Sequence, residues 1–567
     1  MNRRRFLAVV AVLVLCAAAV AARCVQISVL QNEAWAQRAR RQHQQVIEVP
    51  GPRGSVRSSD GYLLATSVSR VAIQVDTKLL TYPEIFARAA APLLGTTEKE
   101  LDGRLRRGPR AVWLAQRMPR EAGEKVRSMA PQAVVLVPDF ARAYPLGSLA
   151  APVVGFVGRE ELRTVGRAGF EHHFDALLTG EPEQYLAVND AIQRKVRLER
   201  LHRGRPGFDL ELTLHARLQA RCETELARAI KEHRARAASA VVMEAQTGRI
   251  LAIASLPSFD PADPGASPPE NWRLRPVQDA FEPGSTVKPM VAAAALSSGV
   301  VARGERFDCS NRGVHVAGRW IRDHVDPGVY TLDEVVTYSA NAGIIEVAER
   351  IPREILWRAF DGFGFGRRTG MGFPGESRGL LAETRAWSKM SRSGIALGQE
   401  ITVSPLQLAA AYSAIANGGW LPRPQLVQVG EKAEQHQRVR VMDEVLALRL
   451  RSMLESVVLE GTGEMARVPG FRTAGKTGTA QRVFRGTFDN DHHVAWFAGF
   501  LPMPDPSLVV VVAIEDPAGP DFWASTVAAP VFAKIAEAAA CLLDLSPAGE
   551  SAPPRLAHRG TETGGAA

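Results

Sequence analysis

Three short motifs in the second half of the chain could together form and break an acyl-serine bond. Ser285-Thr-Val-Lys288 comes first, Ser339-Ala-Asn341 follows, and Lys476-Thr477-Gly478 lies nearest the C-terminus. A serine hydroxyl is a poor nucleophile until a neighbouring base takes its proton, and a partly desolvated lysine can be that base. A bare Ser-x-x-Lys occurs by chance on the order of once or twice in a chain of this length. All three motifs in this order, each in a plausible local context, are hard to produce by accident.

The first motif is expected to place its lysine beside its serine. Phe281-Glu-Pro-Gly284 has the residues of a turn, and an Ala-rich helix is predicted to begin at Ser285. Residues three apart share a helix face, so Lys288 should lie beside Ser285 and accept its proton. Pro289 fits the first turn, where the N–H groups have no partner within the helix. For this motif alone, an ordinary surface helix is the alternative.

The second motif is expected in a loop after the helix-forming residues 331–336. There the Ser339 hydroxyl can relay a proton between Lys288 and an amine. The Asn341 amide can orient Lys288 and a substrate carbonyl. A Ser-Ala-Asn sequence is also an everyday turn or helix cap, so this motif decides nothing alone.

The third motif is predicted to form an edge strand that a ligand approaches closely, because it combines small residues with β-branched threonines. A free strand edge lets an extended peptide add to the sheet. The side chains of Lys476, Thr477 and Thr479 suit a terminal carboxylate, and Gly478 leaves room for the substrate backbone. The main-chain N–H groups of Ser285 and Thr479 are the expected donors to an oxyanion.

A phosphate-binding loop is an alternative for the same residues. Residues 470–477 match the pattern Gly-x-x-x-x-Gly-Lys-[Ser/Thr]. That loop needs a buried strand before it and a helix starting at its Lys-Thr. Arg467-Val-Pro469 makes a poor buried strand, and Gly478 and Thr479 suit a strand better than a helix. We therefore favour the edge strand.

Composition restricts the classes of protein. The chain has 567 residues, 46% of them hydrophobic and 23% charged, which excludes global disorder and allows two or three domains. The net charge of +9 fits a surface facing anionic lipid or an acidic wall polymer better than nucleic acid, since no nucleic-acid-binding motif is present. No metal-ligand spacing occurs, so neither metal nor cofactor is expected. His492-His493 is expected in a solvated loop rather than in a metal site.

The N-terminus is predicted to anchor the chain in a membrane. Arg3-Arg4-Arg5 precedes an apolar run that extends, with one interruption at Arg23, to Ile27. At about 1.5 Å per residue this run can cross a hydrocarbon core of about 30 Å. Residues 1–27 are therefore expected to be a cytoplasmic tip and a transmembrane anchor, with the rest of the chain exported. A cleaved signal peptide is the alternative, because the run is short and ends in small residues.

The remaining chain is predicted to have three parts. Residues 28–235 form a mixed region that starts with a helix at 28–45, residues 236–545 form the catalytic region, and residues 546–567 form a disordered tail. In the catalytic region a strand hairpin opens the sequence, and a second strand pair and a helix close it. These elements are at 240–244, 249–254, 493–501, 508–514 and 530–543. Strands at both ends with helices between them indicate an α+β domain whose sheet joins distant segments.

With these residues in hand, the chain resembles the class B penicillin-binding proteins, which are peptidoglycan D,D-transpeptidases. The likeness covers nearly all of the chain, and its catalytic segments most resemble the division-specific (septal) branch. Ser58-Ser59 is a departure, because the family usually has Asp-Arg there, and the charge pairing of that region is left open. The segments that carry the likeness, besides the three motifs, are residues 53–56, 61–65, 142–145, 155–158, 166–171, 247–248, 257–260, 282–285, 375–376 and 403–407.

The resemblance implies an N-terminal membrane anchor, an elongated pedestal domain of the dimerisation type, and a C-terminal transpeptidase domain. The last would be serine β-lactamase-like, with an antiparallel sheet flanked by helices. It also implies that Ser285 attacks the penultimate D-Ala carbonyl of a stem pentapeptide. The terminal D-Ala then leaves, and a side-chain amine of a neighbouring stem forms the cross-link. β-Lactams would acylate the same serine.

The implied setting is the bacterial inner membrane, with a single span and the catalytic domain on the periplasmic side. The implied partners are stem peptides ending in D-Ala-D-Ala, a SEDS-type glycosyltransferase and divisome proteins. One alternative is a D,D-carboxypeptidase or β-lactamase-like hydrolase, in which water replaces the amine. Another is a scaffold that activates the glycosyltransferase, with transpeptidation secondary. No glycosyltransferase module is apparent ahead of residue 235, which argues against a bifunctional class A enzyme.

Overall fold

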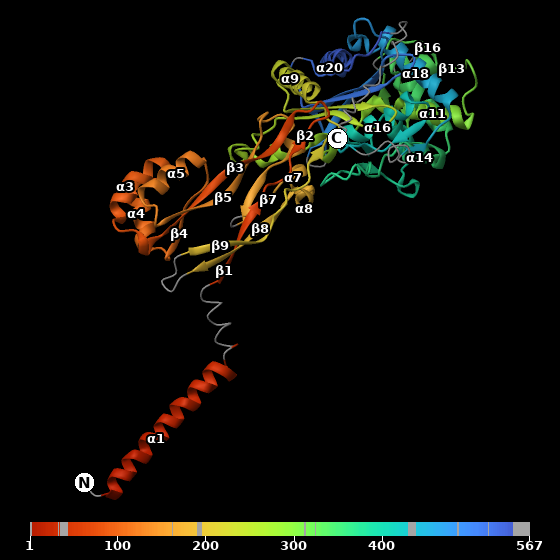
Figure 1. Ribbon diagram of the computed structural model, residues 1–567. Helices are drawn as coiled ribbons and strands as arrows, with labels where there is room; N and C mark the ends of the chain where they lie inside the picture. Colours follow the sequence, from red (N-terminus) through yellow and green to blue (C-terminus); the bar gives the residue numbers. More distant parts are fainter. Residues whose placement is uncertain are drawn as a thin grey trace, which may run out of the picture.

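The computed structural model describes residues 3–31, 33, 44–160, 163–189, 195–310, 313–323, 325–428, 438–484, 487–519 and 521–547. Along its length lie an N-terminal helix, an elongated middle part and a larger globular part (Figure 1). Helix α1 (Arg3–Val25) continues into the short turn η1 (Gln26–Leu30). Residues 6–29 are apolar and long enough to cross a membrane, and none of this stretch is buried. The helix expected at 28–45 lies mostly outside the described residues, as does the tail after residue 547.

The middle part, the pedestal, is built on two sheets. The order of the three-stranded sheet is β1-β8-β9, and the five-stranded sheet has the path β10-β2-β3-β4 with β5 also paired to β3. Their bounds are β1 (Gln44–Gly51), β2 (Val56–Arg57), β3 (Leu63–Asp76), β4 (Ala111–Met118), β5 (Val134–Ala143), β8 (Gly180–Asn189), β9 (Lys195–His202) and β10 (Leu210–Glu211). Helices α3 (Pro83–Leu94), α4 (Glu98–Arg107) and α5 (Arg120–Met129) gather at one end of β3, β4 and β5 (Figure 1). The smaller elements are α6 (Ala151–Val154), β6 (Val157–Glu160), β7 (Arg163–Gly166), α7 (Gly169–His173) and α8 (Asp175–Leu178).

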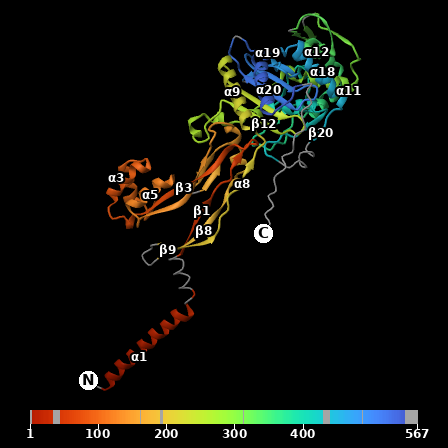
Figure 2. The same cartoon turned by 45° about the horizontal axis from the view of Figure 1, so that its top comes forward.

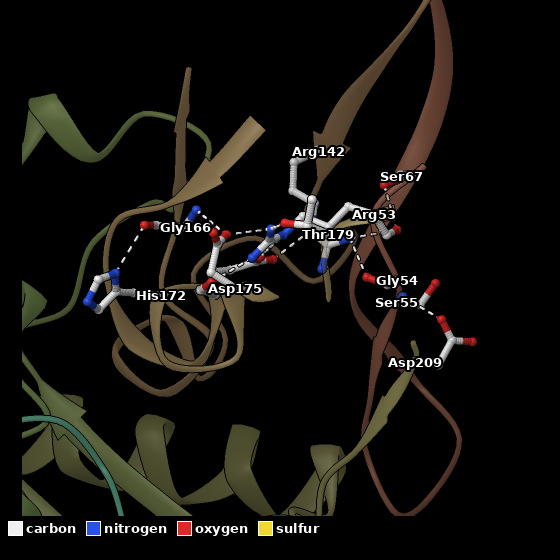
Figure 3. Close-up of polar contacts among 11 residues, drawn as sticks. Arg53, Gly54, Ser55, Ser67, Arg142, Gly166, His172, Asp175, Thr179 and Asp209 are labelled. Carbon is white, nitrogen blue, oxygen red and sulfur yellow. Dashed lines mark hydrogen bonds and ion pairs between the residues drawn. The ribbon is translucent and has the colours of Figure 1, made fainter. Parts of the chain in front are cut away.

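A buried charge cluster ties the pedestal together. The Glu171 carboxylate forms ion pairs with Arg53 Nε at 2.5 Å and with Arg142 Nε at 2.6 Å. The side chains of all three residues are at most 4% exposed. Arg53 also pairs with Asp175 at 2.7 Å and donates to Thr179 at 3.0 Å. Figure 3 shows Arg53, from the segment after β1, close to Arg142 of β5 and to Asp175 of the short helix α8. Each charge therefore has a partner in a place where an unpaired charge would be very costly.

Ser58 and Ser59, the departure from the family pattern, are hydrogen-bonded. Ser58 donates to Asp60 at 2.7 Å, and Ser59 donates to the main-chain oxygen of Leu214 at 3.0 Å. Asp60 in turn accepts from the main-chain N–H of Ala216 at 2.8 Å, and Ala216 is the first residue of helix α9 (Ala216–His233). The carboxylate at 60 thus caps a helix N-terminus with support from the hydroxyl at 58.

The catalytic domain is α+β, as predicted, and its five-stranded antiparallel sheet joins strands from both ends of the domain. The order is β12-β11-β23-β22-β21, with β11 (Ala237–Glu244), β12 (Ile250–Leu256), β21 (Ala474–Phe484), β22 (Thr487–Leu501) and β23 (Leu508–Glu515). Every residue of the central strand β23, LVVVVAIE, is buried. Val509 and Val511 belong to one hydrophobic core, and Val510 and Val512 belong to the other. The sheet therefore needs helices on both faces, because successive side chains of a strand point to opposite sides.

Two helices cover one face of this sheet. Helix α9 (Ala216–His233) and helix α20 (Ala529–Leu542) lie together there, and they stay side by side in both views (Figures 1 and 2). Leu218, Cys222 and Leu226 of α9 share a core with Phe532 of α20. The predicted boundary at 235 assigns α9 to the pedestal, whereas this packing joins the helix to the catalytic sheet.

The other face of the sheet carries the helices that surround the three motifs. The longest are α11 (Lys288–Ser298), α16 (Pro405–Ala416) and α18 (Glu444–Glu460), and α11 and α16 are buried along nearly their whole length. The remaining helices on this face are α10 (Arg275–Gln278), α12 (Leu332–Tyr338), α13 (Asn341–Arg350), α14 (Arg353–Gly362) and α15 (Ser391–Ala396). Short two-stranded pairs complete it: β13 (Arg306–Asp308) with β16 (Val329–Thr331), β14 (Gly313–Val316) with β15 (Arg319–Arg322), β17 (Leu380–Leu381) with β18 (Ile401–Thr402), and β19 (Trp420–Pro422) with β20 (Arg438–Arg440). Helix α19 (Ala524–Val527) instead packs in the core under α9 and α20.

The expectation of a solvated loop at His492-His493 is wrong. Both residues lie in β22, which begins at Thr487 rather than near 493. The His493 side chain is buried and stacks on Phe522, with 4.3 Å between ring centroids. The polar run that precedes these histidines has no apolar alternation, so its pattern does not predict a strand.

Candidate active site

Ser285 lies at the start of a helix, as predicted, although the first turn is tighter than expected. Residues Gly284–Val287 form the 3-10 turn η5, and α11 begins at Lys288 with Pro289 in its first turn. Gly284 has φ 55°, a left-handed conformation that a glycine adopts without strain. A Cβ at this position would lie 3.1 Å from the main-chain oxygen of Thr479. The glycine therefore brings the serine segment close to strand β21.

Lys288 is completely buried, and its ammonium has three acceptors. It donates to the main-chain oxygen of Ser339 at 2.6 Å, to the Ser339 hydroxyl at 3.2 Å and to Asn341 Oδ1 at 2.8 Å. Burial lowers the pKa of Lys288 to about 7, while the nearby Asp323 and Cys309 act in the opposite direction. The amine can thus lose its proton near neutral pH, which a general base requires. Within the described part of the chain, the Ser285 hydroxyl makes no hydrogen bond.

The Ser-Ala-Asn motif occupies a sharp corner between two helices. Thr331 and Glu334 form a capping box at the start of α12, and the helix ends at Tyr338. Ser339 then takes φ 65°, a conformation uncommon for a serine, and α13 starts at Asn341. The corner directs the Ser339 oxygens and the Asn341 amide toward Lys288. The structure therefore brings the first two motifs into direct contact.

Asp323 belongs to this cluster, and the sequence did not predict it. Its two carboxylate oxygens accept from the main-chain N–H groups of Asn341 at 2.9 Å and Ala342 at 2.8 Å. The carboxylate is buried beside the N-terminus of α13 and faces Lys288 closely enough to raise the lysine pKa. Asp323 is a single aspartate after the short strand β15. It has no fixed spacing from any of the three motifs, so the sequence pattern does not identify it.

Lys476 and Thr477 lie in the edge strand β21. The Lys476 side chain is fully buried, and its Nζ lies 3.4 Å from the hydroxyl of Thr462 and 3.5 Å from that of Thr477. The two threonine hydroxyls are 2.7 Å apart. Burial lowers the pKa of Lys476 well below its usual value, and the charge of Lys288 lowers it further. The two lysines are thus electrostatically coupled, which connects the first motif to the third. Thr462, which follows α18, is a second neighbour that the sequence did not predict.

Gly478 and Thr479 continue the same strand along the serine segment. A Cβ at Gly478 would lie 2.6 Å from the main-chain oxygen of Pro283 and 2.8 Å from Thr286 Cγ2. The Thr479 hydroxyl accepts from the main-chain N–H of Ala524 at 3.0 Å, and its own proton is left to donate. Because Lys476 and Thr477 lie inside a strand, no helix starts at the Lys-Thr pair. The phosphate-binding loop therefore does not form.

Two family models match the chain. The model described as "Penicillin binding protein transpeptidase domain" covers residues 238–537, and "Penicillin-binding Protein dimerisation domain" covers residues 48–212. Stage V sporulation protein D of Bacillus subtilis is 32% identical over 85% of this chain and 77% of its own length. Peptidoglycan D,D-transpeptidase FtsI of Escherichia coli is 31% identical over 86% of this chain and 83% of its own length.

A solved structure has the same architecture. The crystal structure of penicillin-binding protein 3 from Mycobacterium tuberculosis, complexed with aztreonam, matches with a TM-score of 0.67 at 26% identity. The match covers 90% of this chain and 99% of that one. The geometry of the three motifs agrees with these comparisons. Two domain models match in the expected order, the relatives are similar over most of both chains, and the solved structure has the same fold. The chain belongs to the penicillin-binding proteins and is a class B peptidoglycan D,D-transpeptidase.

Proposed function

We propose that Ser285 is the acylated nucleophile of this transpeptidase and that Lys288 is its general base. The observation that carries the proposal is the buried Lys288 amine, held by Ser339 and Asn341 and with a pKa lowered to about 7. In its neutral form this amine can take the Ser285 proton as the hydroxyl attacks. The helical turn from 285 to 288 puts both groups on one face.

The reaction follows from these positions. The Ser285 oxygen attacks the penultimate D-Ala carbonyl of a stem peptide, and the main-chain N–H groups of Ser285 and Thr479 donate to the oxyanion. The Ser339 hydroxyl, 3.2 Å from Lys288 Nζ, passes the proton to the departing D-Ala amine. An amine of a neighbouring stem peptide then attacks the acyl-enzyme, forms the cross-link and releases Ser285. A β-lactam acylates the same oxygen.

The third motif provides the groups for the substrate carboxylate. Thr477 and Thr479 present hydroxyls along β21, and Lys476 supplies a nearby amine. Strand β21 is the last strand of the sheet, so an extended stem peptide can pair along its outer side. Gly478 allows β21 to lie close to Pro283 and Thr286 of the serine segment.

The cellular setting is part of the proposal. The arginines at 3–5 favour a cytoplasmic N-terminus, α1 would cross the membrane as an anchor within residues 1–27, and the catalytic domain would then lie outside. The proposed domain bounds are 28–235 for the pedestal, 236–545 for the transpeptidase domain and 546–567 for the tail, with helix α9 at the end of the first range packed on the transpeptidase sheet. The similarity to FtsI supports a septal role. The proposed partners are a SEDS-type glycosyltransferase and divisome proteins, as the family resemblance implies. If a Ser285→Ala chain still stimulated polymerisation by that partner, scaffolding and catalysis would be separate roles.

The test is labelling with a fluorescent penicillin in membranes that contain the chain. Wild type should give a covalent band, and Ser285→Ala should give none. Ser297→Ala, on the exposed end of α11, is the matched control and should label like wild type. A band that survives Ser285→Ala would show that another residue is the nucleophile. Folded wild-type protein without a band would favour the scaffold function.

A further inference from the structure

Two carboxyl groups lie behind the nucleophile and have no part in the reaction described above. Glu282 precedes Ser285 by three residues, and Glu400 lies just before β18. The main-chain N–H of Glu400 donates to Glu282 Oε1 at 3.1 Å. The two residues therefore join two segments of the catalytic domain that are far apart in the sequence.

The segment that carries Glu400 supports the serine segment along its length. Phe281 and Val403 exchange two main-chain hydrogen bonds, at 3.0 and 2.8 Å, and Gly284 donates to the Gly398 oxygen at 3.3 Å. The contact is so close that a Cβ on Gly398 would lie 2.1 Å from the Gly284 oxygen. Strand β21 closes the opposite side of Gly284. The position of Ser285 thus depends on how closely residues 398–403 approach.

The charge of Glu282 is poorly compensated at this contact, whereas Glu400 is exposed to solvent. Glu282 Oε2 is buried and, within the described part of the chain, has no hydrogen-bond partner. The Glu400 carboxylate accepts from the Ser391 hydroxyl at 2.6 Å, and the Trp496 indole N–H of β22 donates to the Glu282 main-chain oxygen at 3.1 Å. Both donors are neutral, so Glu400 is the charged group that acts on Glu282. Burial raises the pKa of Glu282 to about 7; the Glu400 N–H opposes this shift, and the negative charge of Glu400 adds to it.

We propose that Glu282 and Glu400 are a positioning pair for Ser285. While Glu282 is neutral, Glu400 alone is negative and the two segments stay in contact. When Glu282 ionises, two adjacent carboxylates repel each other and separate residues 398–403 from residues 281–284. Ser285 then moves away from Lys288 and from the oxyanion donors. The inference rests on the proposed acylation of Ser285 and predicts that acylation slows on the alkaline side of pH 7.

The experiment is the pH profile of the acylation rate constant, measured between pH 5.5 and 8.5 with a fluorescent penicillin and the full-length chain in detergent. In wild type the rate should fall above pH 7, by up to about tenfold per pH unit, because one ionisation removes the active form. Glu282→Gln and Glu400→Gln should each abolish this decline, because either variant removes the repulsion. The double variant should behave like the single variants. Glu354→Gln, an exposed carboxyl on α14, should keep the wild-type profile.

Thermal unfolding as a function of pH is the second measurement, and it does not depend on labelling. A carboxyl whose pKa is raised in the folded state stabilises the fold below pH 4.5 and loses that contribution as pH rises toward 7. The Tm of wild type should therefore fall more across this range than the Tm of Glu282→Gln.

Three results would overturn the inference. One is a wild-type rate that stays constant from pH 7 to 8.5, and another is an alkaline decline that persists in both Gln variants. The third is the absence of labelling at every pH, which would also contradict the proposed function. Normal labelling without any effect of the Gln variants would contradict the positioning pair alone.

Discussion

The Asp323 carboxylate accepts a hydrogen bond from the main-chain N–H of Asn341 at 2.9 Å, and Asn341 Oδ1 accepts one from the ammonium of Lys288 at 2.8 Å. One buried carboxylate thus fixes the start of α13 and sets the electric field around Lys288, the proposed general base. Its negative charge favours the protonated lysine, whereas burial favours the neutral one. The pKa of about 7 is the result of these opposing effects.

Replacing Asp323 by Asn should make Lys288 a weaker base. The amide keeps the size of the carboxylate and can still accept one of the two main-chain hydrogen bonds, but the negative charge is lost. The pKa of Lys288 should then fall below its present value of about 7, and the acid limb of the acylation profile should move to lower pH. Asp333→Asn on α12, an exposed residue, is the control. An unchanged acid limb would show that Asp323 acts only as a helix cap.

The decline of the acylation rate constant at acid pH should follow the protonation of the Lys288 amine. Below pH 7 the neutral fraction falls tenfold per pH unit, so the acylation rate constant should fall about tenfold per unit as well. Lys288→Arg keeps a charge that cannot be removed in this range and should lower the rate by about 10²–10⁴-fold at all pH values. The measurement is stopped-flow or gel-based acylation. If Lys288→Arg retained a pH-dependent rate close to wild type, another group would be the base.

Gly478→Ala should displace the serine segment. The new methyl group would meet the Pro283 oxygen and Thr286 in a place where the main chain must move to make room. Overpacking of this kind costs about 1–3 kcal/mol, which corresponds to about 5–150-fold in the acylation rate if the strain is relieved by moving Ser285. Gly362→Ala has open space around its Cβ and should act like wild type. Equal acylation rates in the two variants would argue against a tight fit between β21 and η5.

Glu171→Gln should destabilise the pedestal without changing the chemistry at Ser285. The substitution leaves the guanidinium groups of Arg53 and Arg142 buried without their shared countercharge. Removing one member of a buried ion cluster costs about 3–5 kcal/mol, which denaturant unfolding would detect. Labelling per folded molecule should stay the same. Glu160→Gln breaks only an exposed pair and should cost about 0–1 kcal/mol. A similar small cost for both variants would contradict the importance of the buried cluster.

The sequence predicted the elements whose local pattern is strong. The continuous apolar run of β23 and the hairpin of β11 and β12 are strands because buried β-branched residues leave few alternatives. Lys476 was predicted on an edge strand because small and β-branched residues surround it. Pro289 was predicted in a first helical turn because it cannot continue a helix from within. Each of these predictions rests on neighbours in sequence.

Residues that act through distant contacts could not be predicted. Asp323 caps a helix that starts at Asn341, and Thr462 reaches Thr477 from the end of α18; neither pair has a fixed spacing. The place of α9 on the catalytic sheet is likewise decided by its contact with α20, about 300 residues later in the chain. An amphipathic helix shows that one face is buried, but not which partner covers it.

Strand β21 stands at the edge of the sheet, and this has a consequence for antibiotic resistance. The free edge of a sheet forms hydrogen bonds with main-chain groups, which every peptide has. A β-lactam presents an amide and a carboxylate in the same arrangement as the end of the stem peptide. A substitution that tilts or shifts β21 will therefore weaken drug acylation and wall synthesis together. A substitution that weakens drug acylation but preserves wall synthesis has to change side chains that contact the parts in which drug and stem peptide differ. Resistance that leaves growth intact should thus arise outside the β21 edge.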